Sequence, residues 1–176
     1  MYSPAEVARR YVETGKSKAA LPVGRMLLLG MLAGAFIALA GGAATFAVSY
    51  GGRLAGAAVF PAGLAMVLLA GSELFTGNCL LVIPLLERQL TWGRMLRSWG
   101  IVYLANVLGA GLVAALTVAA GTFDGVYESV VATAAAKAGL PFLTALLRGV
   151  LAACLPLTYN RCSASVRYLP DRRYWK

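Results

Sequence analysis

Histidine is absent from this sequence of 176 residues. Histidine is the commonest proton shuttle and metal ligand near neutral pH, so Ser-His and Cys-His catalytic pairs are excluded. The three cysteines show no metal-ligand spacing and are expected to be small buried apolar side chains (Cys79, Cys154 and Cys162). No plausible carboxylate pair is present either. We therefore expect no enzyme, no metal and no cofactor; a membrane-bound enzyme is the disfavoured alternative.

Charged residues are also scarce. They make up 13% of the chain, against 60% hydrophobic residues, whereas soluble domains carry about a quarter charged residues. This composition predicts an all-α membrane protein whose main partner is the lipid bilayer. The net charge is +9, but the basic residues lie between and beyond the apolar runs. That arrangement is typical of topology control and excludes nucleic acid as a partner.

Four apolar stretches follow one another along the chain. The first three cover residues 26–50, 54–86 and 99–120. The fourth begins near residue 138 and ends near residue 154. A helix needs about 20 apolar residues to cross the hydrocarbon. The second stretch is too long for one straight helix and is interrupted at residues 71–78, so it predicts a broken helix. Gly30 with Gly34, and Gly109 with Gly111, predict close helix packing in a bundle or oligomer.

The polar segments divide the chain into three parts. Residues 1–24 are expected to form an amphipathic helix on the cytoplasmic face, with a merely ordered tail as the alternative. Residues 25–155 form the membrane domain, and residues 156–176 a basic polar tail. Lysine and arginine precede the first span and recur in residues 87–97, which places both segments in the cytoplasm. Trp92, Trp99 and Tyr103 are expected to anchor the membrane interface.

The interruption at residues 71–78 places Glu73 inside an apolar span. Backbone leaves the helix at membrane depth only where protein or a wet cavity covers it, and an ionisable residue there indicates a functional site. The new helix start presents N–H groups with partial positive charge, which suit an anion. Thr76 can donate a hydroxyl hydrogen bond, and Gly77 permits a tight turn. Glu73 is a poor anion ligand, so we expect it to accept loop N–H groups and hold the break in shape.

Residues 69–78 read LAGSELFTGN, which resembles the first signature of the formate–nitrite transporter family. Supporting segments are KA at 18–19, GAFIA at 34–38, TWG at 91–93 and NVLGA at 106–110, and the similarity covers roughly residues 3–152. The resemblance implies an aquaporin-like fold of two inverted three-span repeats in the bacterial cytoplasmic membrane. It also implies a homopentamer with one path per protomer for small monovalent anions such as formate, nitrite or hydrosulfide.

The resemblance gives further residues a role. Phe60, Leu64 and Leu74 match positions at which relatives narrow the path, and Phe75 adds to this constriction; ordinary packing is the alternative. Lys137 matches a lysine that attracts the anion; an ordinary loop lysine is the alternative. In the mechanism that the resemblance implies, the solute is attracted as an anion and crosses the membrane as the protonated acid. Transport would then be coupled to protons. Asn78 completes the matched loop.

From about residue 153 the sequence departs from the family. Relatives carry an asparagine where Ala153 stands, and then a second broken helix, a histidine facing the position of Thr76, and a last span. About four of the family's six membrane segments are therefore expected here. A change of reading frame near residue 153 would explain the departure, and a real short variant is the alternative. Anion transport is the predicted function. The alternative is a truncated non-conducting fragment or a subunit that acts only in assembly.

Overall fold

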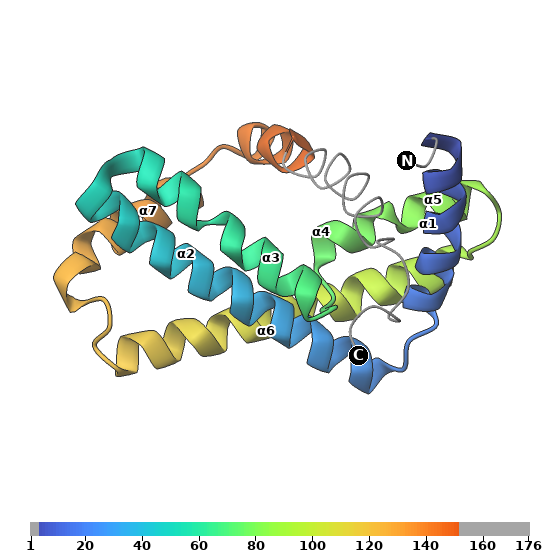
Figure 1. Ribbon diagram of the computed structural model, residues 1–176, viewed down its shortest axis with the longest axis horizontal. Helices are drawn as coiled ribbons and strands as arrows, with labels where there is room; N and C mark the ends of the chain where they lie inside the picture. Colours follow the sequence, from blue (N-terminus) through green and yellow to red (C-terminus); the bar gives the residue numbers. More distant parts are fainter. Residues whose placement is uncertain (1–3, 152–176) are drawn as a thin grey trace, which may run out of the picture.

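The computed structural model describes residues 4–151, which are helical with no strand (Figure 1). The elements are α1 (Pro4–Ala19), α2 (Val23–Val59), α3 (Pro61–Leu69), α4 (Phe75–Asn78), the 3-10 turn η1 (Cys79–Leu81), α5 (Val82–Leu86), α6 (Trp92–Ala119), the 3-10 turn η2 (Asp124–Val126) and α7 (Tyr127–Ala138). A further helix covers Phe142–Leu151. The all-α membrane fold expected from the sequence is confirmed. Cys154, Cys162, Ala153 and the basic tail lie outside the described residues.

Gly52 turns the chain back on itself within α2. Its φ of 76° and ψ of −178° lie in a region that is essentially restricted to glycine. Beyond this turn the chain packs antiparallel to its own first half, since Gly56 lies against Val48 and Gly63 against Ala40. The first two predicted spans therefore meet at Gly52. Figure 1 shows α3 returning alongside α2.

A seam of small residues joins α2 to α6. The buried residues of α6 recur every three or four positions, as expected for one face of a helix (Met95, Ser98, Val102, Ala105 and Gly109). A Cβ on Gly34 would meet the backbone of Asn106, and one on Gly109 would meet the backbone of Met31. The two helices therefore approach to backbone contact, as the glycine spacing predicts. Gly111 has no neighbour within 4 Å among the described residues, so it takes no part in this seam.

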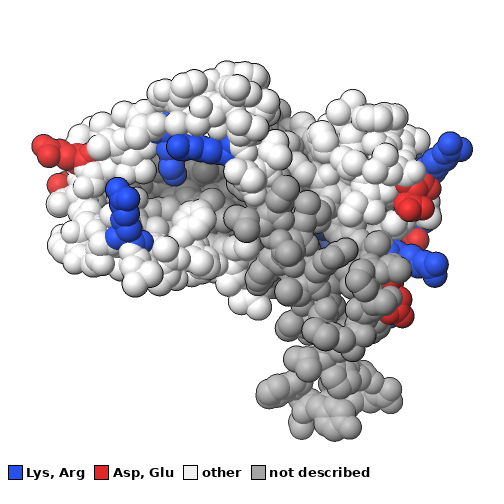
Figure 2. Space-filling view, turned by 90° about the horizontal axis from the view of Figure 1, so that it is seen from above, with Lys and Arg blue, Asp and Glu red and all other residues white. Residues whose placement is uncertain are grey.

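The other face of α6 is apolar and exposed, through residues such as Leu104, Leu108 and Leu116. Among the described residues, Val23–Leu69 and Trp92–Ala119 are long and apolar enough to cross a membrane. Figure 2 shows most visible charged side chains in two groups, one toward each end of the molecule. An apolar middle between charged ends is the surface that a bilayer requires.

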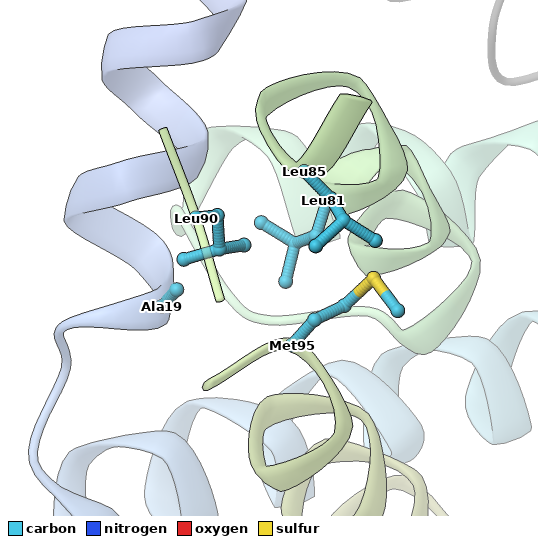
Figure 3. Close-up of a cluster of buried hydrophobic side chains, with 5 residues drawn as sticks. All are labelled: Ala19, Leu81, Leu85, Leu90 and Met95. Atoms are coloured by element: carbon cyan, nitrogen blue, oxygen red, sulfur yellow. The ribbon is translucent and has the colours of Figure 1, made fainter. Parts of the chain in front are cut away.

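One end of the molecule is built by α1, α5 and the start of α6. Together with η1 and the loop before α6, they form a buried apolar cluster around Leu81 (Figure 3; Ala19, Leu81, Leu85, Leu90 and Met95). The Lys16 ammonium donates to the side-chain oxygen of Gln89 over 3.2 Å. The N-terminal helix and the loop before α6 thus share one end, as the predicted topology requires.

The opposite end carries the Gly52 turn, η2 and α7. The rings of Phe46 and Phe123 stack there with centroids 5.4 Å apart. Residues 127–138, which lie between the third and fourth predicted apolar stretches, form α7, and Phe142–Leu151 follows at a bend of 102°. The alanine-rich sequence of α7 favours helix, and Gly139 with Pro141 ends it. Hydropathy did not find α7 because it carries both acidic and basic residues.

Candidate functional site

The second apolar stretch is broken between α3 and α4, as predicted. The non-helical part is residues 70–74, shorter than the predicted 71–78, because the helix already restarts at Phe75. From there α4, η1 and α5 form one apolar helical segment, Phe75–Leu86, which we call the half-helix. The half-helix lies next to α1 in Figure 1.

The backbone of the break is tied to α3 and α2. Gly71 turns the chain with a φ of 64°. The N–H and hydroxyl of Ser72 both donate to the Val67 carbonyl, over 3.0 and 3.1 Å. The Glu73 N–H donates to the Leu29 carbonyl over 3.1 Å. These bonds satisfy groups that a broken helix would otherwise leave unpaired at membrane depth.

Asn106 on α6 ties the two sides of the break together. Its side-chain oxygen accepts the Phe75 N–H over 2.9 Å. Its side-chain nitrogen donates to the carbonyls of Gly30 and Glu73, over 2.8 and 2.9 Å. The sequence analysis used Asn106 only as part of a matched segment and missed this role. The available signal was a lone amide in an apolar span, where a polar side chain needs a partner.

Glu73 is paired with Lys18 of α1. The carboxylate is nearly buried, with 6% of the side chain exposed, and accepts two hydrogen bonds from the Lys18 ammonium, over 2.9 and 3.0 Å. The sequence analysis expected loop N–H groups as its partners, whereas these bonds come from a lysine 55 residues earlier. The ammonium offsets the negative charge of the carboxylate, so the break carries less charge that would repel an anion.

Tyr11 adds a second contact between α1 and the break. Its hydroxyl donates to the Gly77 carbonyl over 3.1 Å. Burial, and after it the negative charge of Glu73, raise the pKa of Tyr11 well above its usual range. The phenol therefore stays protonated near neutral pH and remains a donor. One turn along α1, Gly15 lies directly against Pro84 of the half-helix.

Trp99 and Asn78 join α6 to the far side of α4. The indole N–H of Trp99 donates to the Asn78 carbonyl over 2.8 Å, and its ring lies edge-on to Phe75 at 6.1 Å. Tyr103 packs on Phe75 in the same way at 5.4 Å. The predicted interface anchor Trp99 thus packs against the break. The buried Asn78 amide donates weakly to Ser98 over 3.4 Å, and its side-chain oxygen has no partner among the described residues.

The predicted path residues fall into two groups. Leu74, Thr76 and Gly77 lie half-buried at the start of the half-helix, together with Phe75. The Thr76 hydroxyl has no hydrogen-bond partner within residues 4–151. Phe60 stands at the junction of α2 and α3, 48% exposed, with Leu64 one turn further on.

Lys137 is not brought to the break. It is exposed in the last turn of α7, which contacts α2 and η2. Figure 1 places α7 at the end of the molecule opposite α1. Within the described residues, then, Lys137 lies at one end of the apolar region, apart from the half-helix.

The second apolar stretch is thus broken at this signature, and α1, α2 and α6 hold the break. The chain matches the sequence profile of formate/nitrite transporters over residues 5–158. The chain belongs to the formate/nitrite transporter family. This match covers the break, both helices that are long enough to cross a membrane and the whole of the helix Phe142–Leu151.

Individual relatives show how far the similarity extends. The uncharacterized transporter YrhG of Bacillus subtilis is 42% identical over 120 residues, which cover 63% of this chain and 45% of YrhG. A probable formate transporter of Methanothermobacter thermautotrophicus is 37% identical over 122 residues, covering 64% and 44%. The formate channel FocA of Escherichia coli K12 is 30% identical over 182 aligned positions, covering 97% and 64%. The chain thus spans about half to two thirds of the length of these relatives.

Proposed function

We propose that this member of the formate/nitrite transporter family takes part in moving small monovalent anions, such as formate or nitrite, across a bacterial cytoplasmic membrane. The relatives are named as transporters and channels, which favours transport over catalysis. The observation that carries the proposal is the start of the half-helix. It ends a break inside an apolar span, and its Thr76 hydroxyl has no partner in the part of the chain that the structure describes.

In this proposal the anion binds at the start of the half-helix. The first N–H groups of a helix carry partial positive charge, and the Thr76 hydroxyl adds a donor beside them. Lys18 offsets the charge of Glu73, which removes most of the repulsion that a free carboxylate would exert. In this proposal Glu73 shapes the break, while Thr76 contacts the solute.

The apolar residues around this start would narrow the path. Phe60, Leu64, Leu74 and Phe75 form the proposed constriction, which strips water from the solute and favours its neutral form. Lys137 would attract the anion from the end of the molecule that carries α7. The solute would then arrive as an anion and cross as the acid, so that transport is coupled to protons.

Assembly and orientation complete the proposal. We place the end with α1 and the loop before α6 in the cytoplasm, because Arg25, Arg88, Arg94 and Arg97 are exposed there. The exposed apolar faces of α2 and α6 suit both lipid and neighbouring copies, and a homopentamer is the expected assembly.

Flux through purified protein tests the proposal. Proteoliposomes that contain the chain should take up labelled formate or nitrite faster than empty vesicles. Thr76→Val should slow this uptake by about tenfold, because one hydrogen bond to a charged group is lost. Thr45→Val is the matched control, since among the described residues the Thr45 hydroxyl bonds only to the Gly41 carbonyl in its own helix. Assembled protein without any flux would instead support a non-conducting or assembly-only subunit.

A further inference from the structure

The Asn106 amide lies where three parts of the chain meet. Its partners are the Gly30 carbonyl in α2, the Glu73 carbonyl in the break and the Phe75 N–H of the half-helix. All three distances are 2.8–2.9 Å, the ordinary length of a good hydrogen bond. Both donors and the oxygen of the amide are therefore in use. A leucine would fill a similar space but would leave the Glu73 carbonyl and the Phe75 N–H without this partner, whereas the Gly30 carbonyl lies inside the regular part of α2.

This pairing decides which donors stay free. The Phe75 N–H is taken by Asn106, whereas the N–H groups of Thr76 and Gly77 have no partner within residues 4–151. The Thr76 hydroxyl is free in the same part of the chain. Without Asn106 the Phe75 N–H would join these free donors, about 1.5 Å from that of Thr76 along the helix axis.

We propose that Asn106 is a positioning residue of the anion path, which fixes the start of the half-helix so that Thr76 and Gly77 supply the donors that meet the anion. This inference rests on the proposed function. It assigns to α6 a part in anion preference, although Asn106 itself bonds only to protein backbone. Formate and nitrite place their acceptor atoms differently, so a displaced set of donors changes the preference between them.

The test compares Asn106→Leu and Asn106→Ser with the wild type in proteoliposomes. Asn106→Ser is the variant more certain to fold, because its hydroxyl and a water molecule can meet the same backbone groups. Thr117→Val is the matched control, since within residues 4–151 the Thr117 hydroxyl bonds only to carbonyls inside α6. Uptake is measured against formate and nitrite concentration, and all rates are normalised to the amount of assembled protein. Hydrogen exchange is followed at the amides of residues 73–78.

For both Asn106 variants we expect the half-saturating formate concentration to change by about tenfold, with a changed nitrite-to-formate ratio. The Phe75 amide should exchange faster, and Thr117→Val should match the wild type in every measurement. Variants that keep the wild-type half-saturation and ratio, and lose only assembled protein, would overturn the inference. A wild type that transports neither anion contradicts the proposed function instead. In that case hydrogen exchange at the Phe75 amide tests the role of Asn106. Unchanged protection of this amide in Asn106→Leu would overturn the positioning role.

Discussion

The ion pair between Lys18 and Glu73 is unequally exposed to water. The Lys18 side chain is 26% exposed, whereas that of Glu73 is 6% exposed. Removing the lysine therefore leaves a buried charge, while removing the glutamate leaves an ammonium that can still reach water. In soluble proteins, breaking a buried pair from one side costs about 3–5 kcal/mol.

This asymmetry makes a prediction about stability. Lys18→Met should destabilise the protein by several kcal/mol, Glu73→Gln by less, and the double variant less than Lys18→Met alone. The measurement is thermal unfolding in detergent, followed by size-exclusion chromatography. Equal losses in the two single variants would contradict the asymmetry. The formate-to-nitrite preference of assembled Glu73→Gln should equal that of the wild type, since Glu73 bonds to Leu29 and Asn106 through its backbone, which this substitution leaves in place.

At this scale the sequence predicted single residues but not their partners. Glu73 and Thr76 stand out because a charge and a hydroxyl interrupt an apolar run. Lys18 does not stand out, since it is one of several basic residues before the first span and its partner lies 55 positions away. Asn106 was missed for the same reason: its three bonds reach residues 31 to 76 positions earlier.

Among the elements, α2 and α6 depend on glycine where their backbones touch. A Cβ on Gly34 would collide with the backbone of Asn106, which cannot yield as a flexible side chain does. The same substitution at Gly111 meets nothing within 4 Å among the described residues. The two positions are therefore a matched pair for testing the seam.

We predict that Gly34→Ala prevents stable assembly, while Gly111→Ala is neutral or stabilises by about 0.5–1 kcal/mol through helix propensity. Yield of monodisperse protein and the unfolding temperature check this. A well-assembled Gly34→Ala protein would show that α2 and α6 can separate without loss of the fold. Such a result would also weaken the role given to Asn106, which spans the same contact.

Hydropathy predicted the spans because the bilayer imposes a length and a composition on them. It predicted the break but placed its end at residue 78, since no local signal shows that Asn106 lets the helix restart at Phe75. It missed α7 because that helix is exposed and mixed in character. A local sequence pattern therefore could not predict features that depend on contacts between distant parts of the chain.

For the whole molecule, the charged ends and the apolar middle make an orientation testable. Arg53 lies beside the Gly52 turn at one end, and Glu87 lies before α6 at the other; both are exposed. In a background with Cys79, Cys154 and Cys162 replaced by serine, we predict that an impermeant maleimide labels Arg53→Cys in intact cells. Glu87→Cys should react only after the membrane is permeabilised. The reverse pattern would contradict a cytoplasmic α1.

The amide that closes the break also sets an order of events during synthesis. A ribosome makes Lys18 before Glu73, but Asn106 follows Phe75 by 31 residues. Until then, a nascent hairpin of α2 and α3 ends in carbonyl and N–H groups that hydrocarbon cannot satisfy. The hairpin should therefore wait at the insertion machinery until α6 emerges, so that three spans enter the lipid as one unit.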